Sequence, residues 1–139
     1  MIYKAIYTLC NTELIPPASI YFGSAPAGVT GSYIVFFKVD DLERPLTLCN
    51  AQGDTGEALF QFSGYVGGGV GAANPSATVE LLEDLKSQIN QIKGVIGTAP
   101  DDYRIWDNVT GGVRLLGDGS SSLGVWGAFF EMTLRWEKL

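Results

Sequence analysis

The run Trp126-Gly-Ala-Phe-Phe-Glu-Met-Thr-Leu-Arg-Trp-Glu137 decides the fold. Apolar and polar residues alternate along it with the two-residue period of a strand that is buried on one face only. Only Phe129 interrupts the polar face. This alternation favours an antiparallel sheet. The face expected to point into the core consists of Trp126, Ala128, Phe130, Met132, Leu134 and Trp136.

Further segments have strand character. Residues 32–39 are β-branched, aromatic and almost uninterrupted, which predicts a central strand covered on both faces. From residue 57 onward, Ala58, Phe60 and Phe62 alternate with more polar positions and predict a half-buried strand. Short strands are expected at residues 20–22, 46–49, 103–106 and 113–116, and loops at residues 40–45, 108–112 and 117–124.

Two helices are predicted. In residues 2–10 the apolar side chains share one helical face, and Pro16-Pro17 prevents continuation. Asn74 and Pro75 suit the start of a second helix, whose apolar stripe continues to Ile96. The sequence therefore predicts a single α+β domain over residues 1–139. Its mainly antiparallel sheet is expected to carry a short N-terminal helix and one long helix packed on it.

Charge and composition exclude some functions. Nine basic and fifteen acidic residues give a net charge of −6, which argues against wrapping around nucleic acid. No apolar run is long enough for a membrane span, and the N-terminus lacks a secretory signal, so residence in the cytoplasm without a membrane partner is expected. Cys10 and Cys49 lie in apolar surroundings, which favours buried free thiols. The tripeptide starting at Asn108 fits a glycosylation sequon, which carries no weight without secretion.

The glycine-rich residues 63–76 raise the question of a nucleotide loop, because residues 67–72 fit G-x-G-x-x-A. A dinucleotide loop needs an acidic residue at the end of the next parallel strand, but that position falls within the predicted helix. A P-loop needs a lysine that is missing between Arg44 and Lys86. Residues 64–73 are therefore expected to form a flexible connection between the sheet and the long helix, which becomes ordered when subunits meet.

The sequence indicates no catalytic residue, cofactor or metal site. Histidine is absent, which removes the usual general base and the commonest metal ligand. The carboxylate pairs at residues 40–41, 83–84 and 101–102 suit solvated faces, and a calcium loop at Asp118 lacks further acidic ligands. Trp126 and Trp136 suit the core better than a stacking surface. A binding or assembly protein is expected rather than an enzyme.

The chain as a whole resembles the tail terminator, or tail completion, proteins of long-tailed bacteriophages. The resemblance lies in the order of elements: a short helix, residues 20–26, the strand 33–39, a variable loop, the strand 58–65 with Gln61, one long helix, and final strands at 103–107 and 130–136. It rests on the order of the elements and on the general residue pattern of each, rather than on an invariant motif. The chain departs from the family in the glycine-rich residues 66–73 and in the loop around residues 120–122.

The resemblance implies a six-subunit ring that caps the tail tube, stops its polymerisation and joins the neck proteins. DNA would pass transiently through the lumen, and the protein would reside in the virion after assembly in the host cytoplasm. Candidate subunit or tube contacts are Asp40, Asp41, Glu43, Arg44, Leu46, Leu48, Asp118 and Leu123. Two other functions remain open: another neck or tail component, such as a connector or tube protein, and a small non-enzymatic binding module.

Overall fold

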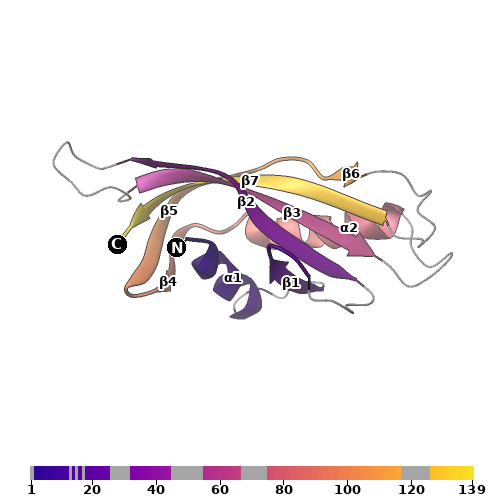
Figure 1. The fold of residues 1–139 in the computed structure, drawn as a ribbon, viewed down its shortest axis with the longest axis horizontal. Helices are drawn as coiled ribbons and strands as arrows, with labels where there is room; N and C mark the ends of the chain where they lie inside the picture. Colours follow the sequence, from indigo (N-terminus) through magenta and orange to yellow (C-terminus); the bar gives the residue numbers. More distant parts are fainter. Residues whose placement is uncertain are drawn as a thin grey trace.

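The computed structural model describes residues 2–12, 14, 16, 18–25, 32–44, 55–66, 75–116 and 126–139. Its elements, which Figure 1 shows, are two helices and seven strands within these ranges. In chain order they are α1 (Ile2–Thr12), β1 (Ser19–Phe22), β2 (Tyr33–Arg44), β3 (Thr55–Val66), α2 (Pro75–Ile89), β4 (Gly94–Thr98), β5 (Asp101–Thr110), β6 (Arg114–Leu116) and β7 (Trp126–Lys138).

The strands form one sheet in the order β1-β2-β3-β7-β5-β4, and β6 pairs with β7 beyond the end of β5. All pairs are antiparallel except β1 with β2. The prediction of an α+β fold with a mainly antiparallel sheet is confirmed. The run that decided this prediction became β7, which lies near the middle of the sheet between β3 and β5.

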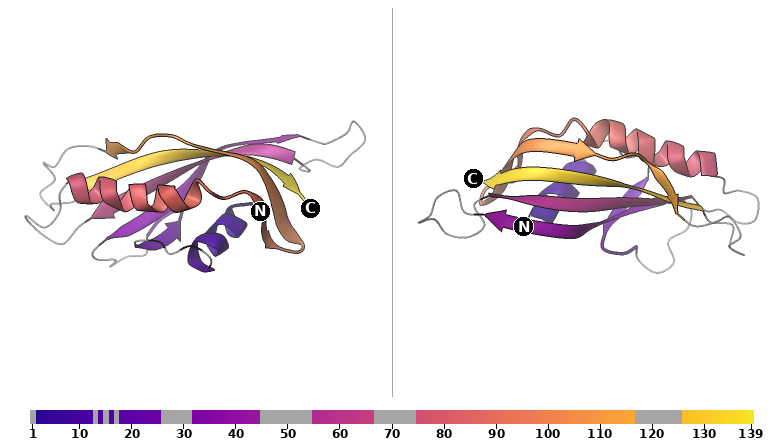
Figure 2. Two further views of the ribbon diagram at one scale, coloured as in Figure 1. Left: turned by 180° about the vertical axis from the view of Figure 1, so that it is seen from behind. Right: turned by 90° about the horizontal axis from the view of Figure 1, so that it is seen from above.

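One core lies between the sheet and both helices. The alternation of β7 is confirmed from Ala128 to Trp136, whose inward side chains are at most 4% exposed; the side chain of Trp126 lies outside the described ones. Rings stack in a row from Phe36 through Phe62 to Phe130 across three strands. Ile6 of α1 and Leu85 of α2 belong to the same cluster, so both helices cover the same face of the sheet (Figure 2).

The helix predicted to run to Ile96 is shorter. It ends at Ile89, and Gly94, the first residue of β4, adopts a left-handed φ of 83°. Ile92 and Ile96 are still buried in the core, from a turn and from a strand respectively. Ile92 and Ile96 therefore keep the spacing of a helical apolar face because both still pack in the core after the helix has ended.

Two other boundaries and the burial of one strand also differ from the prediction. Residues 40–44, expected in a loop, continue β2 and pair with β3, and residues 108–110, also expected in a loop, belong to a single long β5. The strand at 32–39 is not covered on both faces, because Phe37 and Val39 are exposed. The strand expected at 46–49 lies outside the described residues.

Glycine is required at the β4–β5 turn and at one helix–sheet contact. Gly97 has a φ of 86°, and a Cβ there would collide with the carbonyl oxygen of Asp101. A Cβ at Gly64 would lie 3.0 Å from the side chain of Leu82, so the missing side chain lets α2 approach β3.

Only part of the glycine-rich stretch belongs to the described residues. Residues 64–66 belong to β3, so they are strand rather than a flexible connection; residues 67–74, including the predicted cap Asn74, lie outside the described residues. The strand that follows α2 pairs with β5 in antiparallel fashion. The described elements around α2 therefore do not form the parallel βαβ unit that a dinucleotide loop needs.

Candidate functional site

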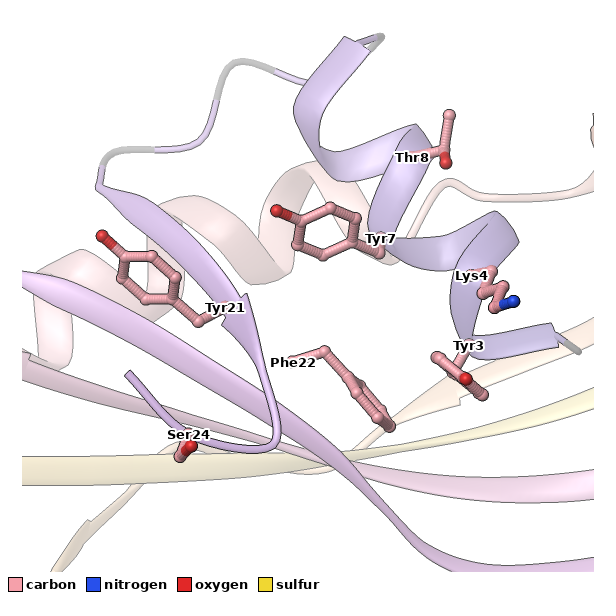
Figure 3. A pocket seen from close by; sticks show the side chains of 7 residues that line it. All are labelled: Tyr3, Lys4, Tyr7, Thr8, Tyr21, Phe22 and Ser24. Carbon is pink, nitrogen blue, oxygen red and sulfur yellow. The ribbon is translucent and has the colours of Figure 1, made fainter. Parts of the chain in front are cut away.

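An aromatic groove opens between α1 and β1 (Figure 3). Its volume is about 460 Å³, within the range of ligand pockets, and it is open to solvent along one side. We call this hollow the α1–β1 groove. Its lining side chains are Tyr3, Lys4, Tyr7, Thr8, Tyr21, Phe22 and Ser24.

The spacing of tyrosines on α1 creates the wall of the groove. Tyr3 and Tyr7 lie four residues apart and therefore on one side of the helix, next to the face that is buried in the core. Tyr3 stacks on Phe22 with ring centroids 4.2 Å apart, and Phe22 meets Phe36 edge-on at 5.2 Å. Because Phe36 is fully buried, the floor of the groove is fixed to the core.

The groove combines exposed aromatic surface with a single charge. Tyr7 is 40% exposed and Phe22 is 38% exposed. Figure 3 shows the rings of Tyr7 and Tyr21 coming from the helix and the strand on either side of the opening. Lys4 is the only charged side chain in the lining, in a chain whose net charge is −6. The groove therefore suits an apolar side chain from a segment that is neutral or weakly acidic.

A second exposed feature lies on the face of the sheet opposite the helices, which we call the outer face. Trp106 sits where the β5–β7 register shifts between Ile105 and Asp107, and it is 62% exposed. Its indole N–H donates to Glu137 Oε2 at 3.2 Å, and the Arg104 guanidinium lies 5.5 Å from the centre of its ring. The tryptophan is therefore held in place although it is exposed.

Paired charges flank Trp106 on the outer face. Arg104 lies 3.6 Å from Glu137, and the Arg135 guanidinium donates to Glu57 at 2.7 Å. The bond from Glu57 raises the pKa of Arg135 further above its already high range. These pairs are partly exposed to solvent and contribute little stability, so their main effect is to set the charge pattern beside the tryptophan. A hollow of about 490 Å³ lies between Trp106 and Arg135.

The interface residues predicted from the sequence occupy different parts of the chain. Asp40 is exposed on β2. Asp41, Glu43 and Arg44 continue β2 with their backbones opposite Ala58, Gly56 and Thr55 of β3. The predicted contacts outside the described residues are Leu46, Leu48, Asp118 and Leu123.

The sequence reasoning missed both exposed aromatic features. The i, i+4 spacing of Tyr3 and Tyr7 was a signal for the groove, but Tyr21 and Phe22 become its other wall only through the parallel pairing of β1 with β2. Trp106 gave no comparable signal, because its exposure depends on a register shift.

Within the described ranges, histidine, cysteine and acidic side chains form no group that could hold a metal ion. Among the described carboxylate pairs, Glu83 and Asp84 are exposed on α2, and Asp101 is exposed at the start of β5. No helix in the described part of the chain is both long and apolar enough to cross a membrane. Asn108 of the sequon is 8% exposed, within β5.

The fold and these two surfaces define an α+β protein with two exposed aromatic surfaces, the α1–β1 groove and the surface around Trp106. No protein-family model matches the chain, and no curated protein matches it at a significant level.

Proposed function

We propose that the chain is a subunit of a bacteriophage tail terminator. Six copies form a closed ring that sits on the last ring of the tail tube, stops its polymerisation and presents a joining surface to the neck proteins. A heterologous contact that closes on itself ends growth, because each subunit's two contact surfaces are then both occupied. The order of elements along the chain, which resembles that of tail terminators, supports this assignment.

The observation that carries the proposal is the aromatic surface left exposed at two separate places. The α1–β1 groove exposes Tyr7 and Phe22, and the outer face exposes Phe37, Trp106 and Val109. Exposed apolar surface beside polar residues marks contact sites in soluble proteins, and tryptophan beside arginine is typical of the residues that dominate such contacts. A ring subunit needs two different contact surfaces for its neighbours and further ones for the tube and the neck.

The charge of the chain agrees with a position around DNA. A net charge of −6 gives the ring an acidic character, and an acidic lumen lets the phosphate backbone pass without being retained. The assembled ring resides in the virion, at the junction of tail and neck, after formation in the host cytoplasm.

The test is an assay of tail-tube growth. Tail tube protein from the same genome is allowed to polymerise with and without the purified chain, and tube lengths are measured by electron microscopy. The proposal predicts that tubes stop growing and carry a ring at one end. Tubes of unchanged length without a terminal ring would contradict it, and incorporation of the chain along the tube would identify a tube protein instead.

A further inference from the structure

We propose that Trp106 of one copy of this chain inserts into the α1–β1 groove of a second copy. This contact is the head-to-tail link of the ring, so the inference rests on the proposed function and names its interface. Both sides of the contact belong to the described residues: the groove lies on the side of the sheet that carries the helices, and the tryptophan lies on the outer face.

Trp106 has the properties of an anchor residue. It is the most exposed of the large apolar side chains that the structure describes. The hydrogen bond to Glu137 and the guanidinium of Arg104 nevertheless hold its ring in place. A side chain that is already held loses little freedom when a partner buries it, and tryptophan is among the residues that dominate protein contacts. The free subunit therefore presents an indole that is ready to be covered.

The α1–β1 groove matches an indole in size and chemistry. Its volume of about 460 Å³ lies in the range that holds whole small ligands, so it has room for one indole. The exposed rings of Tyr7 and Phe22 offer stacking and edge-on partners to an inserted aromatic side chain. Phe22 is backed by the buried Phe36, which keeps the floor of the groove in position. Insertion therefore removes aromatic surface from water on both copies.

The charges of the two surfaces are also complementary. Arg104 and Arg135 beside Trp106 are each paired with a glutamate, whereas Asp107 adds a further, exposed carboxylate next to the indole. Lys4 is the only charged side chain in the described lining of the groove. Insertion of the indole brings Asp107 toward Lys4, and this pairing of opposite charges orients one copy on the next.

The sheet separates Trp106 from the groove of its own chain. Ile105 on β5 points into the core cluster that includes Ile6 of α1. Trp106 follows Ile105 and points the other way, toward Glu137, whose neighbour Trp136 is turned inward. The backbone of β5 therefore lies between the indole and α1.

The packing of α1 on β4 also closes the way around the edge of the sheet. A Cβ at Gly97 of β4 would lie only 3.2 Å from the Cβ of Ala5 on α1. The groove opens on the other side of α1, where Tyr3 stacks on Phe22 of β1, and Figure 1 shows α1 between β4 and β1. The occupant is therefore a second copy. Because a residue of the outer face meets a groove on the opposite face, the contact is heterologous, as ring closure requires.

Native mass spectrometry of single variants tests both sides of this contact. Trp106→Ala removes the indole from an exposed position, and Lys4→Glu reverses the charge in the groove. We expect each variant to weaken subunit association by roughly tenfold or more and to lose the ring. The double variant Lys4→Glu with Asp107→Lys restores opposite charges and should regain the ring. The matched control is Leu115→Ala, which removes another exposed apolar side chain, from β6, and should retain the ring.

Mixing two defective variants gives the sharpest readout. The Trp106→Ala chain keeps an intact groove, and the Tyr7→Asp chain, in which one wall of the groove is changed, keeps an intact Trp106. One sound contact therefore remains per pair. We expect heterodimers and no larger species, which also shows that both variants are folded. If Tyr7→Asp does not fold, Lys4→Glu takes its place, because Lys4 is exposed on α1.

The contrary outcomes separate this interface from the proposed function. Two variants that are folded by circular dichroism but form no heterodimer would overturn the contact. A ring that persists in Trp106→Ala would also overturn it and would leave the groove to a tube or neck protein, with the proposed function still standing. A wild-type chain that forms no ring would overturn the ring itself.

Discussion

At the scale of single residues, Cys10 shows how strongly the core acts on a titratable group. It lies on the inner side of α1 and is fully buried, as the sequence predicted for this cysteine; Cys49 lies outside the described residues. Burial raises the pKa of the Cys10 thiol from 9.0 to about 12, because a thiolate there would lose its hydration. The native state therefore retains the proton at pH values where the unfolded chain releases it.

This raised pKa predicts alkaline destabilisation. The stabilising effect of the neutral thiol is complete below about pH 9 and is lost as the pH rises toward 12. Over that window the free energy of unfolding should fall more steeply in the wild type than in Cys10→Ala, by about 1.4 kcal/mol per pH unit. Urea unfolding at a series of pH values measures both slopes. Parallel slopes in the two proteins would show that the thiol does not titrate in this way.

Other residues show what sequence patterns cannot reveal. The inward positions of β7 were predictable because alternation with a period of two follows directly from strand geometry. The exposure of Trp106 was not, because it depends on the register shift between Ile105 and Asp107, which is set by the pairing of β5 with β7. The same limit applies to the α1–β1 groove, whose two walls are far apart in sequence.

At the scale of elements, the end of α2 was the main error. Leu85, Ile89, Ile92 and Ile96 keep a helical spacing, so the apolar pattern alone predicts one continuous helix. The left-handed glycine at 94 and the pairing of β4 with β5 end it instead. For α2 the predicted element was too long, whereas for β2 it was too short. The charge of residues 40–44 suggested a loop, but these residues pair with β3 and continue the strand.

Asn108 explains how the shorter helix is held at its end. Its side-chain amide on β5 donates to the carbonyl oxygens of Ile89 at 2.8 Å and Ile92 at 3.3 Å. Ile89 is the last residue of α2, where helix carbonyls lack helical partners, and Ile92 lies in the turn that follows; the Ile89 carbonyl also accepts from the backbone N–H of Ile92. A buried strand residue thus caps α2 and ties it to the sheet.

Asn108→Ala should therefore destabilise the protein. Removing the amide takes its donor from the Ile92 carbonyl oxygen, while the Ile89 carbonyl oxygen keeps the backbone N–H of Ile92 at 3.0 Å. The loss of these hydrogen bonds should cost about 1–3 kcal/mol. Urea unfolding measures this loss, and Lys93→Ala serves as a control because Lys93 is exposed shortly after the same helix end. If the Asn108 variant unfolds at the wild-type midpoint, the amide does not cap the helix.

At the scale of the whole molecule, the fold leaves two separate aromatic surfaces exposed. The α1–β1 groove lies on the side of the sheet that carries the helices, and Trp106 lies on the outer face. Under the proposed function, two different contact surfaces suit repeated head-to-tail contacts better than a two-fold dimer, in which one surface meets its own copy.

The most direct test of the ring is the mass of the purified wild-type chain in solution. Native mass spectrometry over a rising concentration series should show a species of six copies of the 14.9 kDa chain, about 89 kDa, with no larger polymer. A closed ring predicts this end point because all contacts are then occupied. A single 14.9 kDa species at every concentration, or a dimer that grows no further, would contradict the account.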